Sequence, residues 1–104
     1  MKSSTEQINA ATTAEQRLKD LGIDLPLPPE PFGIYAEAVQ TGNLLFLTGM
    51  LPTDGRTPKF VGLLGAEVNV DQARAATRLA TMNALAVARQ RLGSLDRVSR
   101  IVRL

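Results

Sequence analysis

The longest regular pattern of apolar positions lies between residues 70 and 92. Six small apolar residues recur there at steps of three and four: Val70, Ala73, Ala76, Ala80, Ala84 and Val87. This spacing places them on one face of an α-helix. Asn69 or Asp71 can cap the start of the helix, and Gly93 suits its end. Because the face is mostly alanine, we expect the helix to lie close against a sheet.

Two short apolar runs precede this helix. Residues 34–40 alternate between two faces, which predicts a strand, and residues 44–47 are all apolar, which predicts a strand buried on both faces. Gly42 and Asn43 between them are typical of a tight turn. Pro52 has no amide to donate, so it ends the second strand.

The N-terminal part combines a predicted helix with a proline-rich connector. Residues 3–21 are expected to be helical, with a capping box from Thr13 to Gln16 and a terminating glycine at Gly22. Four prolines within residues 26–31 exclude a helix and indicate an extended strap along the surface.

The remaining segments complete the predicted order of elements. Residues 53–69 form a long connection with a short strand at 59–64, and residues 96–104 are expected to form a third strand. The order helix, strand, strand, loop, helix, strand predicts an α+β fold. We assign residues 1–31 to the N-terminal helix and strap, and residues 32–104 to a single α+β core domain. The chain stops inside the last predicted strand, so we expect further protein to follow.

Composition narrows the possible chemistry. The 104 residues include no cysteine and no histidine, which argues against disulfides, thiolate nucleophiles and zinc or redox-metal sites, so we expect no metal and no cofactor. Any reaction must then use Tyr35, hydroxyls, carboxylates, arginine, backbone amides or water. No apolar run approaches the ~20 residues of a membrane span, and the N-terminus does not resemble a signal peptide. A cytoplasmic location is the default expectation.

Charge is distributed unevenly. Residues 1–70 carry five basic and eight acidic side chains, whereas residues 71–104 carry seven arginines and two aspartates. One interpretation is a nucleic-acid face. The other, which we favour, is a solvated helix and strand, because the chain has only four aromatic residues to stack on bases.

A candidate ligand site lies where the second strand ends. Thr48 offers a hydroxyl and Gly49 an accessible amide, and Tyr35 belongs to the hairpin partner. Each also has a purely structural interpretation. Tyr35 would be a rim aromatic with its hydroxyl in water, Thr48 a satisfied strand-end residue, and Gly49 the residue of a bulge.

Four segments together resemble a known family: Leu-Gly-Ile-Asp-Leu-Pro at 21–26, Pro-x-Gly-x-Tyr at 31–35, Gly-Asn-Leu-Leu-Phe-Leu-Thr-Gly at 42–49 and Leu-Gly-Ser-Leu-Asp-Arg-Val at 92–98. The chain resembles the YjgF/RidA family, in its endoribonuclease L-PSP-like branch with an extra N-terminal helix. The resemblance implies a chorismate-mutase-like α+β fold, incomplete at the C-terminus here, and a homotrimer with ligand clefts between subunits. It also implies hydrolysis of reactive enamines and imines, such as 2-aminoacrylate, to keto acids and ammonia. Other members are described as ribonucleases or translation inhibitors.

The resemblance assigns roles to few residues. Tyr35 matches a tyrosine that lines the cleft, and Thr48 with Gly49 matches a Ser-Gly pair that faces the ligand; Met50 stands where the family often has glutamine. The family's carboxylate-binding arginine and water-positioning glutamate belong to the second half of the fold, beyond Leu104. The leading hypothesis is therefore an imine deaminase acting on a small molecule. The alternatives are a non-catalytic trimer that binds small carboxylates and, last, an RNA-directed protein.

Overall fold

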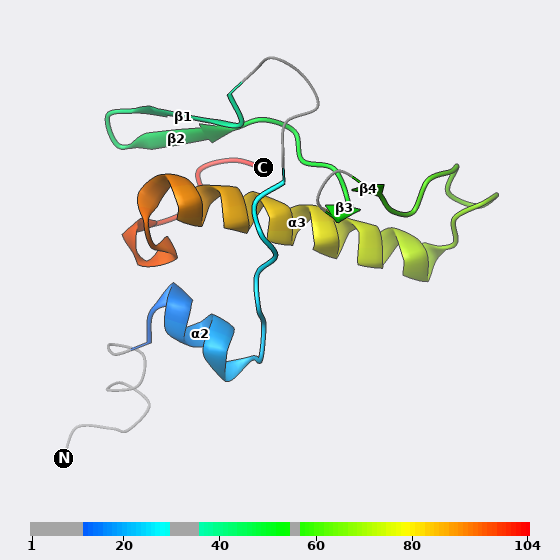
Figure 1. Ribbon diagram of the computed structural model, residues 1–104, viewed down its shortest axis with the longest axis horizontal. Coiled ribbons are helices and arrows are strands. Elements are labelled where there is room, and N and C mark those ends of the chain that lie inside the picture. Colours follow the sequence, from blue (N-terminus) through cyan, green and yellow to red (C-terminus); the bar gives the residue numbers. More distant parts are fainter. Residues whose placement is uncertain (1–11, 30–35, 55–56) are drawn as a thin grey trace.

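The computed structural model describes residues 12–29, 36–54 and 57–104. In chain order the elements are α2 (Ala14–Asp20), β1 (Ala38–Thr41), β2 (Leu44–Leu47), β3 (Thr53–Asp54), β4 (Thr57–Pro58), α3 (Val70–Leu92) and the 3-10 turn η1 (Leu95–Arg97). Helix α3 follows the long axis of the molecule, with the β1–β2 hairpin on one side and α2 on the other (Figure 1). The architecture is α+β, as predicted. Within the described residues, no helix is both long and apolar enough to cross a membrane.

Helix α3 confirms the predicted range at both ends. The Gln72 amide donates to the Asn69 side chain at 2.8 Å, and the Asn69 amide donates to the Gln72 side chain at 2.9 Å, so the capping box is complete. Gly93 ends the helix with φ of 85°, a left-handed conformation that glycine adopts at little cost. The predicted apolar face is buried only toward the C-terminal half, because Val70 remains exposed while Val87 is buried.

The β1–β2 hairpin also confirms the sequence prediction. The strands pair antiparallel from Ala38 opposite Leu47 to Thr41 opposite Leu44, which leaves a two-residue turn. Gly42 has φ of 56° at the first turn position, as a type II′ turn requires. The described strand begins at Ala38, and residues 34 and 35 lie outside the described part of the chain.

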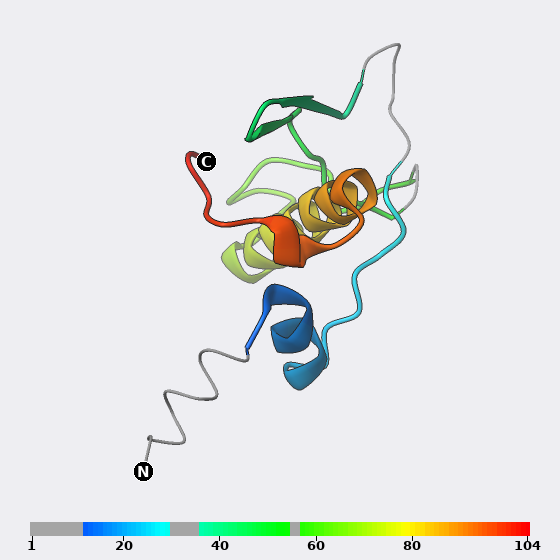
Figure 2. The ribbon, with the colours of Figure 1, turned by 90° about the vertical axis from the view of Figure 1, so that its left-hand side faces the viewer.

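The expectation that residues 44–47 are buried on both faces is wrong for this chain. Strands β1 and β2 contact α3, and Leu45 on that side is half-buried. The opposite face carries Val39, Leu44 and Phe46, which are 51%, 46% and 59% exposed. Turned by 90°, the hairpin is seen to cover α3 with one face while its outer face is left uncovered by the described chain (Figure 2). We call these three side chains the outer face.

Two predicted strands are absent from the described residues. Residues 98–104 follow η1 without regular secondary structure and have no strand partner among the described residues, and a strand needs the backbone of a neighbour to complete its hydrogen bonds. Residues 59–64 are not a strand either, since Phe60 has φ of 57°, which a strand does not allow. The connection instead contains β3 and β4, with Thr53 opposite Pro58.

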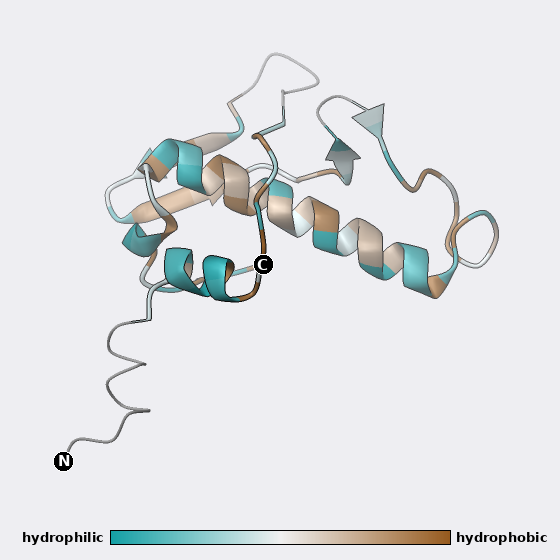
Figure 3. Ribbon diagram, turned by 60° about the horizontal axis from the view of Figure 1, so that its bottom comes forward, coloured by the Kyte–Doolittle hydropathy of each residue, from teal (hydrophilic) through white to brown (hydrophobic). Residues whose placement is uncertain are grey.

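Helix α2 is shorter than the predicted range, and residues 3–11 of that prediction lie outside the described residues. The cap is confirmed, since Thr13 Oγ1 accepts the Gln16 amide at 3.1 Å. The reciprocal bond of the capping box is not seen for α2, where the Gln16 side-chain nitrogen donates to Asp20 at 2.9 Å. Gly22 has φ of 67°, and the Ile23 amide closes the end on the Leu18 carbonyl at 2.8 Å. Helix α2 buries no residue and is hydrophilic over most of its surface (Figure 3).

Candidate functional site

The end of β2 carries a polar group that the described chain does not satisfy. The Thr48 amide donates to the Glu37 carbonyl at 3.0 Å, which extends the hairpin by one pair. The Thr48 hydroxyl oxygen is buried and has no hydrogen-bond partner among the described residues. Such a group costs about 1–3 kcal/mol, so it requires an explanation. The described residues therefore do not supply the partner that the interpretation of Thr48 as a satisfied strand-end residue requires.

Gly49, the next residue, is exposed and its backbone φ lies outside the left-handed region. A Cβ atom built on Gly49 meets no described atom within 4 Å. Neither backbone conformation nor packing against the described residues therefore requires glycine at this position. A surface that comes from outside these residues, such as a ligand or another subunit, would require it.

Glu37 is a neighbour of this site that sequence analysis did not select. Counting outward from the Gly42–Asn43 turn pairs Glu37 with Thr48, and the hydrogen bond between their backbones agrees. Burial raises the pKa of the Glu37 carboxyl above its ordinary value. The signal was present in the sequence, because residues paired across a hairpin share a face.

The three residues predicted for the site are only partly placed. The structure keeps Thr48 and Gly49 together at the end of β2, next to a half-buried Met50. Tyr35 lies outside the described residues. The grouping of the tyrosine with the hydroxyl and the amide stays a prediction.

Asn83 is the second residue that sequence analysis missed. It is 1% exposed, in the middle of α3. Its side-chain amide donates to the carbonyls of Leu51 and Thr53, both at 3.0 Å. A single amide side chain among alanines and leucines of a buried helix face was the signal available in the sequence. Asn83 therefore connects α3 to the segment that follows the site.

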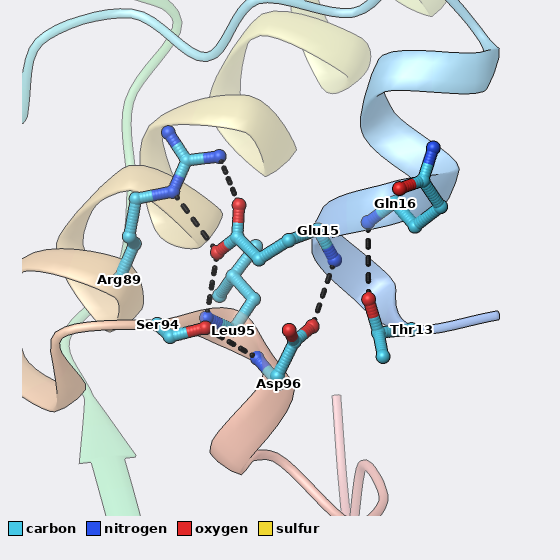
Figure 4. Close-up of polar contacts among 7 residues, drawn as sticks. All are labelled: Thr13, Glu15, Gln16, Arg89, Ser94, Leu95 and Asp96. Atoms are coloured by element: carbon cyan, nitrogen blue, oxygen red, sulfur yellow. Dashed lines mark hydrogen bonds and ion pairs between the residues drawn. The ribbon is translucent and has the colours of Figure 1, made fainter. Parts of the chain in front are cut away.

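A separate polar cluster joins α2 to the end of α3 (Figure 4). The Arg89 guanidinium donates to both Glu15 carboxylate oxygens, at 2.7 and 3.2 Å, and the Leu95 amide donates to the same carboxylate at 2.8 Å. In return, the Glu15 amide donates to the Asp96 carboxylate at 2.9 Å. We call these four residues the Glu15 cluster. The hydrogen bonds from Arg89 and Leu95 lower the pKa of Glu15.

The Glu15 cluster has a structural role in the geometry seen here. Because Arg89 is bound in a bidentate manner by Glu15, it is not free to bind a substrate carboxylate. A shallow hollow of about 210 Å³ lies beside the cluster, lined by Leu18, Ile23, Leu25 and their neighbours. Neither Thr48 nor Gly49 lines it.

Other arginines of the basic half also serve the fold. Arg97 donates to the Leu92 carbonyl at 3.0 Å, and Arg74 lies 4.0 Å from the Asp71 carboxylate on an exposed face of α3. These contacts satisfy C-terminal carbonyls and pair charges along a helix, which are ordinary roles for surface arginines. They favour the interpretation of this region as a solvated face.

Comparison with known proteins adds evidence of a different kind. No family model matches the chain. Protein TCP17 of Trypanosoma cruzi is 36% identical over 87 residues, which cover 84% of this chain and 54% of that protein. A 2-iminobutanoate/2-iminopropanoate deaminase of Dermatophagoides farinae is 44% identical over 39 residues, which cover 38% of this chain and 30% of the deaminase.

Among solved structures, a candidate endoribonuclease of Shewanella oneidensis MR-1 superposes with a TM-score of 0.79 at 36% identity. The match covers 86% of this chain and 60% of that chain. The chain thus spans little more than half the length of the relatives that match most of it. At this identity the likeness covers the sequence as well as the fold.

Proposed function

Because this chain belongs to the YjgF/RidA family, we propose that it acts on small reactive imines of 2-keto acids and hydrolyses them to the keto acid and ammonia. The family resemblance and the name of the mite relative support this substrate class. The observation that carries the proposal is the unpaired Thr48 hydroxyl beside the unobstructed Gly49, at the end of β2.

The reaction needs few groups from the protein. 2-Aminoacrylate first becomes its imine, 2-iminopropanoate, by moving a proton to the methylene carbon. Water then adds to the imine carbon, so that a carbon–oxygen bond forms and nitrogen takes up a proton. The hydroxyl proton then passes to nitrogen as the carbon–nitrogen bond breaks and the carbonyl forms, which releases ammonia and leaves pyruvate. A protein accelerates these steps by holding the substrate carboxylate and by handling protons near the imine.

The residues at the end of β2 fit part of this task. In the proposed bound state the Thr48 hydroxyl, on a residue that is only half-buried, faces the substrate. There the hydroxyl and the Gly49 amide donate to a carboxylate, and the missing Cβ at Gly49 lets the substrate approach the backbone. We assign Tyr35 to the imine end of the substrate. Glu37 lies across the strand pair, and its raised pKa suits proton transfer nearer neutral pH.

The rest of the proposed site comes from outside the described residues. A guanidinium is the natural partner for the other side of the carboxylate, and the second half of the family fold would supply it. We propose a homotrimer with a chorismate-mutase-like sheet and its clefts between subunits, located in the cytoplasm. The outer face of the hairpin, which is apolar and uncovered in the single chain, supports this arrangement.

Ammonia release tests the proposal. The full chain is added to 2-aminoacrylate generated in place by a serine dehydratase, and ammonia formation is compared with buffer alone. Wild-type protein is expected to accelerate it. Thr48→Val and Gly49→Ala are each expected to lower kcat/KM about tenfold or more, which corresponds to losing one good hydrogen bond or a close approach.

Matched controls keep the result specific. Thr57→Val makes the same change of side chain at an exposed position in β4 and should leave turnover unchanged. No acceleration by wild-type protein would overturn the deaminase proposal. If pyruvate protects the protein against thermal unfolding without any turnover, the function is ligand binding instead.

A further inference from the structure

We propose that Asn83 is a positioning residue for the site at the end of β2: it fastens the segment that follows Gly49 to helix α3. The inference rests on the proposed function for its kinetic consequence. Its structural part does not depend on that function, because it predicts which backbone amides the Asn83 side chain holds in place.

The geometry shows two hydrogen bonds from one buried side-chain amide. Asn83 Nδ2 lies 3.0 Å from the Leu51 carbonyl oxygen and 3.0 Å from that of Thr53, with Thr53 Oγ1 at 3.4 Å. Asn83 and Thr53 are 1% and 2% exposed, so the bond to the Thr53 carbonyl is shielded from water, whereas the bond to the Leu51 carbonyl is part-buried. A buried amide with two carbonyl partners is well satisfied and therefore rigid.

The bonded segment is a tight turn. The Thr53 amide donates to the Leu51 carbonyl at 2.9 Å, which closes a three-residue turn around Pro52. The fixed φ of proline suits the centre of such a turn. Asn83 bonds the carbonyls at the first and the last residue of this turn, so it fixes both the position and the direction of the chain.

The turn begins two residues after Gly49, and no helix or strand of the structure intervenes. Movement of the turn therefore carries Gly49 and the Thr48 side chain with it. Helix α3, 23 residues long and capped at both ends, is the rigid element that prevents this movement. A displacement of about 1 Å in a site costs on the order of 100-fold in rate, so such an anchor matters for turnover.

Asparagine is the side chain that this role requires. Alanine would leave the Thr53 carbonyl without this donor and the Leu51 carbonyl with the Thr53 amide alone, and aspartate would direct a negative charge at both carbonyls. Asparagine is a poor helix former, so its place in the middle of α3 is not explained by helix propensity. The two carbonyls of the turn supply the explanation.

The test compares two changes on the same buried helix. Asn83→Ala removes the bonds to the turn, whereas Val87→Ala, at a residue that is 4% exposed, loosens the core without touching them. With 2-aminoacrylate, and with rates corrected for the folded fraction, kcat/KM of Asn83→Ala is expected to fall about 10- to 100-fold. Val87→Ala should stay within about twofold of wild type once the folded fraction is corrected.

Hydrogen exchange measures how firmly the turn is held, and it does not depend on enzymatic activity. The Thr48 and Thr53 amides, both hydrogen-bonded in the structure, are expected to exchange about tenfold faster in Asn83→Ala than in Val87→Ala. In wild-type protein, the Asn83 side-chain amide protons should exchange slowly, a measurement that remains if Asn83→Ala fails to fold. Fast exchange of those protons, or equal exchange of the two backbone amides in both variants, would overturn the inference. A wild-type protein without turnover would overturn the proposed function only, because the exchange results stand separately.

Discussion

The two sides of α3 differ in how many of their polar groups are hydrogen-bonded and in how well their apolar side chains are covered. On the α2 side, the Glu15 carboxylate pairs with Arg89 and accepts the Leu95 amide, and the Asp96 carboxylate accepts the Glu15 amide. On the hairpin side, the Thr48 hydroxyl is buried without a hydrogen-bond partner among the described residues, and the outer face is exposed. The two regions pack on the same helix, but only the α2 side has its polar groups hydrogen-bonded within the described chain.

This difference separates scaffold from site. Polar groups that are already hydrogen-bonded, as in the Glu15 cluster, gain little from a ligand, whereas an unpaired hydroxyl and an exposed apolar face are stabilised by a group that covers them. We therefore assign the α2 side to holding the chain together and the hairpin side to contacts with a substrate or another subunit. Four substitutions test this assignment, beginning with the largest expected effect.

Charge in the shared core should abolish folding. Val87 is 4% exposed on α3, and Val87→Asp would place a carboxylate in the core. We expect a loss of more than about 4 kcal/mol of unfolding free energy, enough to unfold the chain at 25 °C. Circular dichroism and urea titration check this. A cooperative transition at the wild-type midpoint would mean that α3 is not the common core of the two regions.

Removing the Glu15 carboxylate should release α2. Glu15→Gln keeps the shape but loses the ion pair with Arg89 and weakens the bond from the Leu95 amide. Because both side chains of the pair are about one-third exposed, at 27% and 37%, solvent screens the interaction. We expect α2 docking to weaken by about 1–2 kcal/mol. Faster proteolysis between residues 21 and 29 would show it.

The contact between Glu15 and Arg89 also makes the docking of α2 depend on pH. The pKa of Glu15 is lower in the folded chain than its ordinary value of 4.5, so its contribution is present above that value and is lost as pH falls through the folded pKa. Wild-type α2 should thus detach in acid, and Glu15→Gln should flatten this response. Glu67→Gln is the matched control, because Glu67 also accepts a backbone amide, from Leu63, but lies in another part of the chain. An unchanged acid response in Glu15→Gln would contradict the role of the cluster.

Replacing the unpaired Thr48 hydroxyl with an apolar group should stabilise the fold and impair the proposed site. Thr48→Val replaces the unpaired hydroxyl with a methyl group of similar size. We expect the unfolding free energy to rise by about 1 kcal/mol, because the buried polar atom is gone. The same variant should lose turnover, as argued for the substrate carboxylate. A destabilised Thr48→Val would show that the hydroxyl has a partner in the chain and would remove the main support for a site there.

The sequence predicts the parts of this fold that depend on local chemistry. The ends of α3 follow from Asn69 and Gly93, and the β1–β2 register follows from the two-residue turn at Gly42. In each case the deciding residue lies within four positions of the feature it controls. Thr48 and Gly49 belong to the same class, since a strand end can be located from the run of apolar residues that precedes it.

The remainder depends on contacts that are distant along the chain. Asn83 meets Leu51 across 32 positions, and Arg89 meets Glu15 across 74 positions, and no local pattern encodes either pairing. The segment at 98–104 has the composition of a strand but no backbone beside it among the described residues. Strand propensity shows that a segment can pair with a neighbouring strand, but it does not show which strand that is.

The smallest effect on the single chain should come from the outer face. Phe46 is 59% exposed, so Phe46→Ser removes little burial and should change the unfolding free energy by no more than about 0.5 kcal/mol at low protein concentration. Leu45→Ser, on the half-buried inner side of the same strand, is the matched control and should cost about 2 kcal/mol. Sedimentation at rising concentration should then show that Phe46→Ser associates less than wild type, because the apolar area that a second subunit would cover is smaller. Equal destabilisation by both variants at low concentration would mean that the outer face is covered by the chain itself, and the contrast between the two sides of α3 would fail.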